Sequence, residues 1–165
     1  MKQLGLLVLL CLTALSFAPT STLAAQEIKP FVRGSYQQII SARQGKPFII
    51  SFWSLSCGHC MDEMAMLKKL AKKYSKLDLV LVSTDTPEEK KAVTAALARS
   101  SPRKTETWLF ADSYTDPLYF EIDTKWHGEL PRTYFFNAKN EVTAISGKLE
   151  YEEVERWVRE QYTPR

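Results

Sequence analysis

The stretch that most constrains this chain is a strand-like run followed by a pair of cysteines. The apolar run Phe48–Trp53 precedes Cys57 and Cys60, and a series of good helix formers begins at Met61. This order predicts a buried strand, a short loop and a helix, with Cys57 at or just before the helix N-terminus. At that end, unpaired backbone N–H groups and the helix dipole favour a thiolate.

A thiolate at this position would give the cysteine pair its chemistry. The thiolate, not the thiol, attacks disulfides, and a helix N-terminus lowers the ordinary thiol pKa of about 8.5 by roughly one to several units. Gly58 and His59 separate the two cysteines, and a protonated His59 would stabilise the thiolate further. We therefore expect Cys57 to attack a substrate disulfide. Cys60, one helical turn on and more buried, would resolve the mixed disulfide.

The first 25 residues have the pattern of a signal peptide. Lys2 supplies the positive start, an apolar stretch covers residues 4–15, and small residues follow. Leu23 fits an A-x-A cleavage site poorly, so an uncleaved membrane anchor is the alternative. We predict an exported chain, periplasmic or held at the cell envelope, with residues 26–165 forming one domain.

Export would leave two cysteines, because Cys11 lies inside the apolar stretch and would be discarded with it. Cysteines in an oxidising compartment usually staple a structure, but a pair three residues apart closes a very small loop and stabilises little. A redox-active Cys57–Cys60 disulfide explains the count better and needs no other cofactor. A structural zinc site usually takes four ligands, and the chain has one C-x-x-C and two histidines, so no metal is predicted.

Composition and patterning indicate a single α/β domain. The formal net charge of +3 is mild, and no basic patch interleaved with aromatic residues stands out, so nucleic acid is not an expected partner. Residues 25–29 are interpreted as a polar lead-in. Strands and helices then alternate and end in a hairpin and a helix, which predicts an α/β sandwich with a mixed sheet. The expected strands are 48–53, 78–83, 107–110, 132–137 and 141–146; the expected helices are a short one from 35, then 61–74, 85–99, 116–122 and 150–161.

Over about residues 34–157 the chain resembles thioredoxin-fold proteins, and among them the exported TlpA/ResA-like thiol–disulfide oxidoreductases. The resemblance implies a thioredoxin-like three-layer sandwich: a central mixed β-sheet flanked by helices, with the C-x-x-C at a helix N-terminus and a cis-proline loop. The segments that carry it are Gly45-Lys46-Pro47, Phe52-Trp53, Cys57-Gly58-His59-Cys60, Glu63-Met64, Ser83-Thr84-Asp85 and Gly128-Glu129-Leu130-Pro131-Arg132-Thr133.

The resemblance also implies roles for residues outside the cysteine pair. Pro131 would follow a cis bond, and the backbone of Leu130 would then pair with a substrate chain as a strand does. Trp53 would belong to the substrate-binding surface. Glu63 would manage the proton of Cys60, and the alternative for Glu63 is an ordinary acid in the first turn of a helix.

The sequence departs from the family pattern at several positions. Ser51 stands where thioredoxins carry a buried acid, Ser56 stands where a Trp usually precedes the first cysteine, and Ala65 replaces a usual Pro. The Gly58-His59 dipeptide resembles that of protein disulfide isomerases. Stabilisation of the Cys57 thiolate by His59 would favour the reduced form and make the pair more oxidising.

The sequence leaves the direction and purpose of the reaction open. The resemblance favours a periplasmic reductase that reduces or exchanges disulfides in exported proteins, fed by a membrane thiol electron donor, and it suggests cytochrome c or copper-site maturation. The Gly58-His59 dipeptide favours a disulfide oxidase or isomerase instead. Soft thiolates from Cys57 and Cys60 also suit Cu(I), as in a metallochaperone. A redox-inactive interaction domain is a further alternative, against which the paired cysteines argue.

Overall fold

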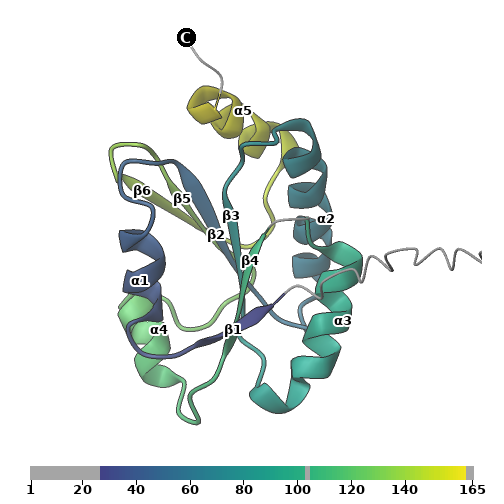
Figure 1. Ribbon diagram of the computed structural model, residues 1–165, viewed down its shortest axis with the longest axis vertical. Coiled ribbons are helices and arrows are strands. Elements are labelled where there is room, and N and C mark those ends of the chain that lie inside the picture. Colours follow the sequence, from purple (N-terminus) through teal and green to yellow (C-terminus); the bar gives the residue numbers. More distant parts are fainter. Residues whose placement is uncertain (1–26, 103–104, 163–165) are drawn as a thin grey trace, which may run out of the picture.

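A mixed sheet lies at the centre of the residues that the structure describes. The computed structural model describes residues 27–102 and 105–162, so the predicted signal peptide at 1–25 falls outside it. Six strands pair in the order β1-β4-β3-β2-β5-β6 (Figure 1). β5 runs antiparallel to β2 and to β6, and the other neighbours are parallel, which confirms the mixed sheet. The strands are β1 Ile28–Phe31, β2 Phe48–Trp53, β3 Leu79–Ser83, β4 Glu106–Phe110, β5 Arg132–Phe136 and β6 Val142–Ser146.

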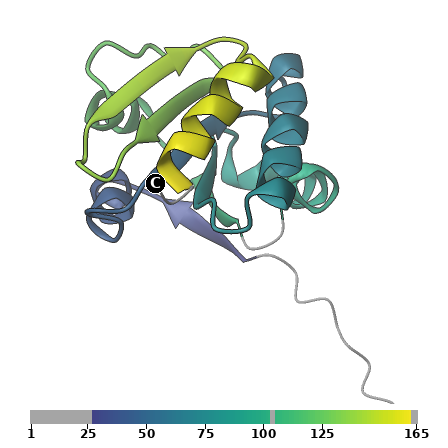
Figure 2. The ribbon, with the colours of Figure 1, turned by 90° about the horizontal axis from the view of Figure 1, so that it is seen from above.

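Helices cover both faces of the sheet and complete the three layers. One buried apolar cluster joins the sheet to α2, α3 and α5, and a second cluster joins its other face to α1 and α4. Figure 2 shows α5, in yellow, beside α2. Within the described residues, no helix is long and apolar enough to cross a membrane. The helices are α1 Ser35–Ser41, α2 Gly58–Lys73, the 3₁₀ turn η1 Pro87–Glu89, α3 Lys90–Ser100, α4 Asp116–Ile122 and α5 Tyr151–Tyr162.

Strand β2 is central, and its side chains alternate between the two clusters. Ile49 and Trp53 belong to the cluster under α2, whereas Phe48, Ile50 and Phe52 belong to the cluster under α1 and α4. Every residue of β2 is buried, because helices cover both faces of the sheet. The double burial explains the nearly continuous apolar run in the sequence, and it makes the end of β2 a fixed platform for the loop that follows.

The predicted polar lead-in is wrong from Ile28 onward, because Ile28–Phe31 forms strand β1. This strand pairs in parallel with β4 at one edge of the sheet. Lys29 and Pro30 obscure the strand in the sequence, since a proline has no N–H for a ladder and is tolerated only at edges or strand ends. The edge position of β1 is therefore what permits this composition.

The stacking of Phe48 on Phe136 provides a test of the packing. The two rings face each other across the β2–β5 pair, with centroids 4.3 Å apart and planes at 4°. Replacing Phe48, which is 1% exposed, by Ala would leave a cavity and lower the free energy of unfolding by about 3–5 kcal/mol. Urea denaturation of the oxidised protein measures the loss.

The matched control is Phe120→Ala, because Phe120 is 68% exposed. A surface substitution of this kind changes the free energy of unfolding by about 0.5 kcal/mol or less. Equal losses for the two variants would contradict the packing of Phe48 described above.

Candidate active site

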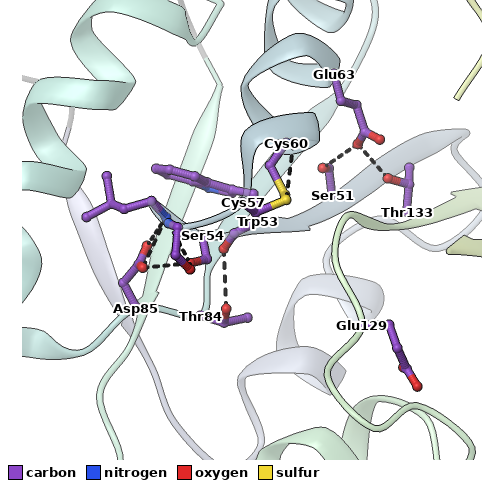
Figure 3. Close-up of a disulfide and its surroundings, with 12 residues drawn as sticks. Ser51, Trp53, Ser54, Cys57, Cys60, Glu63, Thr84, Asp85, Glu129 and Thr133 are labelled. Carbon is purple, nitrogen blue, oxygen red and sulfur yellow. Dashed lines mark hydrogen bonds between the residues drawn. A yellow bond between two sulfur atoms is a disulfide. The ribbon is translucent and has the colours of Figure 1, made fainter. Parts of the chain in front are cut away.

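The two cysteines form a disulfide at the first turn of α2. Their Sγ atoms are 2.02 Å apart, and Cys57 is the N-cap residue of the helix (Figure 3). The Cys57 Sγ accepts the backbone N–H of Cys60 at 3.2 Å. The predicted place of Cys57 at the helix N-terminus is confirmed. A reduced Cys57 in this place would present its thiolate to the same N–H and to the positive end of the helix.

The two sulfurs differ in exposure as thiol–disulfide exchange requires. Cys57 is partly exposed, whereas Cys60 is 1% exposed and belongs to the buried cluster under α2. A partner approaching from solvent can reach the sulfur of Cys57 and not that of Cys60. The order in which Cys57 attacks and Cys60 resolves stays a prediction, and the difference in exposure is the observation that bears on it.

Trp53 lies beneath the site and not on its surface. Its side chain is 0% exposed and packs in the same cluster as Cys60. The indole therefore has no exposed area with which to hold a substrate, and the expected contact does not fit this geometry. The Trp53 carbonyl accepts the backbone N–H of Thr84 at 2.9 Å, which ties the end of β2 to the segment after β3.

Gly58 and His59, the residues predicted to tune the pair, are both exposed in the first turn of α2. A Cβ built on Gly58 would meet nothing within 4 Å, so lack of space does not explain a glycine here. His59 lies in the first turn of α2, at the end of the helix that carries the positive pole of the helix dipole. A cation at this end would add to the field that favours a thiolate.

A buried carboxylate lies three residues after Cys60 on α2. Glu63 is 5% exposed, and its Oε1 accepts hydrogen bonds from Ser51 Oγ and Thr133 Oγ1, both at 2.7 Å (Figure 3). Its Oε2 has no hydrogen-bond partner among the described residues. Burial raises the pKa of the Glu63 carboxyl above its ordinary value of 4.5, and the bonds from Thr133 and Ser51 only partly offset that effect.

The strand register explains why two hydroxyl groups meet Glu63. Ser51 and Thr133 are direct partners across the antiparallel β2–β5 pair, so their side chains lie on the same face of the sheet. Glu63 and Cys60 share a helix face because they are three residues apart. From the sequence, Ser51 was expected only as the replacement of a buried acid and Thr133 only as part of the proline motif, and neither was expected to contact Glu63. The available signal was a hydroxyl residue within an otherwise apolar strand.

The Leu130–Pro131 peptide bond is cis, as the resemblance implied. The antiparallel register pairs Phe52 with Arg132, so the Leu130–Pro131 segment lies just beyond the ladder. Continuing the register places this segment opposite the end of β2, where the loop to Cys57 begins. Pro131 is buried and Leu130 is partly exposed. The structure thus brings the cis-proline loop and the cysteine loop to the same end of the sheet.

Two hydrogen bonds hold the cis-proline loop in place. The Pro131 carbonyl accepts the backbone N–H of Gly147 at 2.9 Å. The indole Nε1 of Trp126, a residue 3% exposed, donates to the Glu129 carbonyl at 2.9 Å. Trp126 therefore packs under the loop, whereas His127 beside it is exposed.

Metal ligands do not gather near the disulfide. Within residues 27–102 and 105–162, no group of three or more His, Cys, Asp or Glu side chains is placed to hold a metal ion. A Cu(I) ion would have Cys57 and Cys60 as soft ligands once they were reduced. Among the described residues, no third His, Cys, Asp or Glu side chain is placed to bind that ion together with the two cysteines.

The fold and the site together define a class of protein. A mixed sheet between helices, a disulfide at the start of α2 and a cis-proline loop at the same end of the sheet characterise a thioredoxin-fold thiol–disulfide oxidoreductase. The resemblance drawn from the sequence motifs is confirmed. The model of the AhpC/TSA family matches residues 15–145. The chain belongs to the AhpC/TSA family.

Solved structures of low sequence identity share the fold, while no curated protein matches the chain. A secreted Mycobacterium tuberculosis disulfide oxidoreductase homologous to E. coli DsbE is 18% identical, with a TM-score of 0.56 over 73% of this chain and 85% of that one. A thiol:disulfide interchange protein of Chlorobium tepidum TLS is 16% identical, with a TM-score of 0.58 over 74% and 83%. A thioredoxin-related protein of Neisseria meningitidis serogroup B is 20% identical, with a TM-score of 0.56 over 76% and 91%.

Glu63 should make the stability of the protein depend on pH. Because its pKa is raised in the folded state, the folded protein keeps a proton that the unfolded chain releases above the ordinary value of 4.5. This stabilisation is complete below that value and is lost as the pH rises through the raised pKa. Between about pH 4 and pH 8 we expect the oxidised wild type to lose stability relative to Glu63→Gln, which cannot ionise.

Urea unfolding of both proteins at the two pH values measures this difference. Asp62→Asn serves as the control, because Asp62 is an exposed acid on the same helix. The control should follow the wild type. If the free energies of unfolding of Glu63→Gln and of the wild type change by the same amount between the two pH values, the protonation assigned to Glu63 is wrong.

Proposed function

We propose that this protein reduces or exchanges disulfides in exported proteins through its Cys57/Cys60 pair. The observation that carries the proposal is the unequal exposure of the two bonded sulfurs at the start of α2, with Cys57 partly exposed and Cys60 1% exposed. Only one of the two sulfurs can meet a protein substrate, and the other is within bonding distance of it.

The exchange proceeds in two steps. In the reduced protein the Cys57 thiolate attacks one sulfur of the substrate disulfide, and the second substrate sulfur leaves as a thiolate. The thiolate of Cys60 then attacks the Cys57 Sγ of this mixed disulfide. The substrate's first sulfur leaves as a thiolate, and the Cys57–Cys60 disulfide forms, so two electrons pass from the protein to the substrate.

Glu63 is the proposed acceptor of the Cys60 proton. Burial disfavours a thiolate at Cys60, so the second step needs a nearby base. Glu63 shares the helix face of Cys60, and its Oε2 has no partner among the described residues. A carboxyl whose pKa is raised by burial holds a proton more strongly than an exposed one, which suits it to this transfer.

Leu130 is the residue whose backbone is proposed to bind the substrate chain. The ladder of β5 begins at Arg132, so the backbone of Leu130 lies outside the pairing of the sheet. An extended substrate segment can pair with it as a strand would. Leu55 and Leu130 are both partly exposed and pack against the cluster that contains Cys60, which supplies apolar contact near the disulfide.

An exported reductase needs a supply of electrons. The signal-peptide pattern of residues 1–25 supports export, and an oxidising compartment would return the pair to its disulfide form. A membrane thiol protein is therefore the proposed donor that reduces the Cys57–Cys60 disulfide again. Maturation of cytochrome c or of copper sites, both of which require reduced cysteines, is the proposed setting.

His59 favours a second candidate function, that of an oxidase or isomerase. The residue lies exposed between the cysteines at the positive end of α2. A thiolate stabilised there makes the reduced form more favourable and the disulfide more oxidising. The reduction potential separates the two candidates, because the same residues serve both directions.

We expect the Cys57–Cys60 pair to have a reduction potential of about −270 mV, the value typical of thioredoxin. The His59→Ala variant should have a more negative reduction potential, because its Cys57 thiolate loses a stabilising cation. Equilibration with glutathione buffers followed by thiol trapping measures both. A wild-type reduction potential between about −120 and −180 mV would contradict the reductase function and support the oxidase or isomerase function.

The cysteine roles predict distinct phenotypes for two variants. Cys57→Ala should abolish the acceleration that the protein gives to insulin reduction by dithiothreitol, because no exposed sulfur is left to attack the insulin disulfide. Cys60→Ser should accumulate a mixed disulfide with the substrate that is visible on a non-reducing gel. Ala65→Ser, at an exposed position of α2, is the control and should keep the wild-type rate. Activity in Cys57→Ala, or a stable mixed disulfide through Cys60, would reverse the roles.

A further inference from the structure

A second buried carboxylate, Asp85, lies at the end of β3 and is not part of the chemistry described above. Asp85 is 7% exposed. Its carboxylate accepts three hydrogen bonds: from Ser54 Oγ at 2.9 Å, from the Leu55 backbone N–H at 3.1 Å, and from Ser83 Oγ at 2.6 Å (Figure 3). Two of these donors belong to the loop that connects β2 to Cys57.

The three donors explain why the residue is an aspartate. A buried charge is costly unless it is paired or hydrogen-bonded. Among the ion pairs formed within the described residues, none involves Asp85. A carboxylate accepts and does not donate, so it matches three converging donors, whereas an asparagine would turn an NH₂ group toward one of them.

Capping of the following helix does not account for Asp85. The sequence predicts a helix over residues 85–99, with Asp85 at its start. In the structure Thr86 is the N-cap of η1, and the Glu89 carboxylate accepts the Thr86 backbone N–H at 3.0 Å. The Asp85 side chain is directed instead toward the loop before Cys57, a contact that the sequence does not reveal.

A chain of hydrogen bonds leads from Asp85 to the cysteine. Ser54 Oγ gives its only proton to Asp85, so it acts as the acceptor for the Ser56 backbone N–H at 3.2 Å and for Ser56 Oγ at 2.9 Å. The Ser54 carbonyl accepts the backbone N–H of Cys57 at 3.2 Å. Asp85 thereby holds the residue on which both Ser56 and Cys57 depend.

We propose that Asp85 is a positioning residue that fixes residues 54–56 and thereby holds Cys57 at the N-terminus of α2. The inference rests on the proposed function, in which Cys57 reacts as a thiolate. A hydrogen bond weakens steeply when its distance and angle change, and the Cys60 N–H must point at the Cys57 sulfur to stabilise its charge. A loosened loop would let the sulfur leave that position.

The test measures how fast iodoacetamide alkylates Cys57 in the reduced protein, with mass spectrometry to identify the labelled cysteine. The rate is determined at pH 7, where stabilisation of the thiolate matters, and at pH 10, where any exposed cysteine is ionised. We expect Asp85→Asn to lower the ratio of the pH 7 rate to the pH 10 rate about tenfold. Ser54→Ala should lower the ratio in the same direction.

The double variant Asp85→Asn/Ser54→Ala should lower the ratio by less than the product of the two single effects, because each single variant already disturbs the Ser54–Asp85 hydrogen bond. Asp112→Asn is the matched control. Asp112 follows β4 and accepts a backbone N–H from Arg33, in the turn before α1, at 3.2 Å, and its removal should leave the ratio unchanged.

Near-UV circular dichroism shows which variants keep the native packing. If Asp85→Asn is native and its ratio equals that of the wild type, the inference is overturned. If Asp85→Asn does not fold, Ser54→Ala decides in its place, because it leaves the Leu55 and Ser83 bonds to the carboxylate intact. If the wild type does not accelerate insulin reduction by dithiothreitol, the proposed function is refuted instead, whatever the alkylation ratios are.

Discussion

The structure depends on one junction, where the C-terminal end of β2 leads into the N-terminus of α2. The first N–H groups of a helix have no partner inside it, and the Cys57 sulfur accepts one of them from Cys60 at 3.2 Å. Both elements are firmly held: β2 is covered on both faces, and α2 is anchored by Met64, Leu67 and Leu70, each 0% exposed. Neither can move without opening a buried cluster, so the sulfur stays at the positive end of the helix.

The buried acid that follows the second cysteine belongs to helix α2 and not to strand β2. Ser51 and Thr133 present hydroxyls to one oxygen of Glu63, and the other oxygen has no partner among the described residues. A carboxylate with both oxygens fully hydrogen-bonded would favour its charged form. With burial dominating, the pKa of Glu63 is raised, which suits the role proposed for it as acceptor of the Cys60 proton.

Much of the fold could be predicted because its signals are local. The apolar run of β2, the helical spacing after the cysteines and the turn of the β5–β6 hairpin each involve residues a few positions apart, and these elements lie within about three residues of their expected bounds. β1 could not be predicted, because Lys29 and Pro30 obscure a strand that exists only through its pairing with β4. The predicted buried strand already implied that Trp53 is buried, and it is the substrate contact implied by the resemblance that does not fit its 0% exposure.

By itself the sequence determined the reacting pair, its spacing, its place at the start of a helix and the proline at the mouth of the site. Only the tertiary structure decided which polar groups contact Glu63 and Asp85. Glu63 meets Ser51 and Thr133 across 12 and 70 positions of the chain, and Asp85 meets Ser54 across 31. Such contacts follow from strand order, register and the packing of a helix on a sheet. Periodicity along the chain cannot encode them, because it describes only neighbours a turn or two apart.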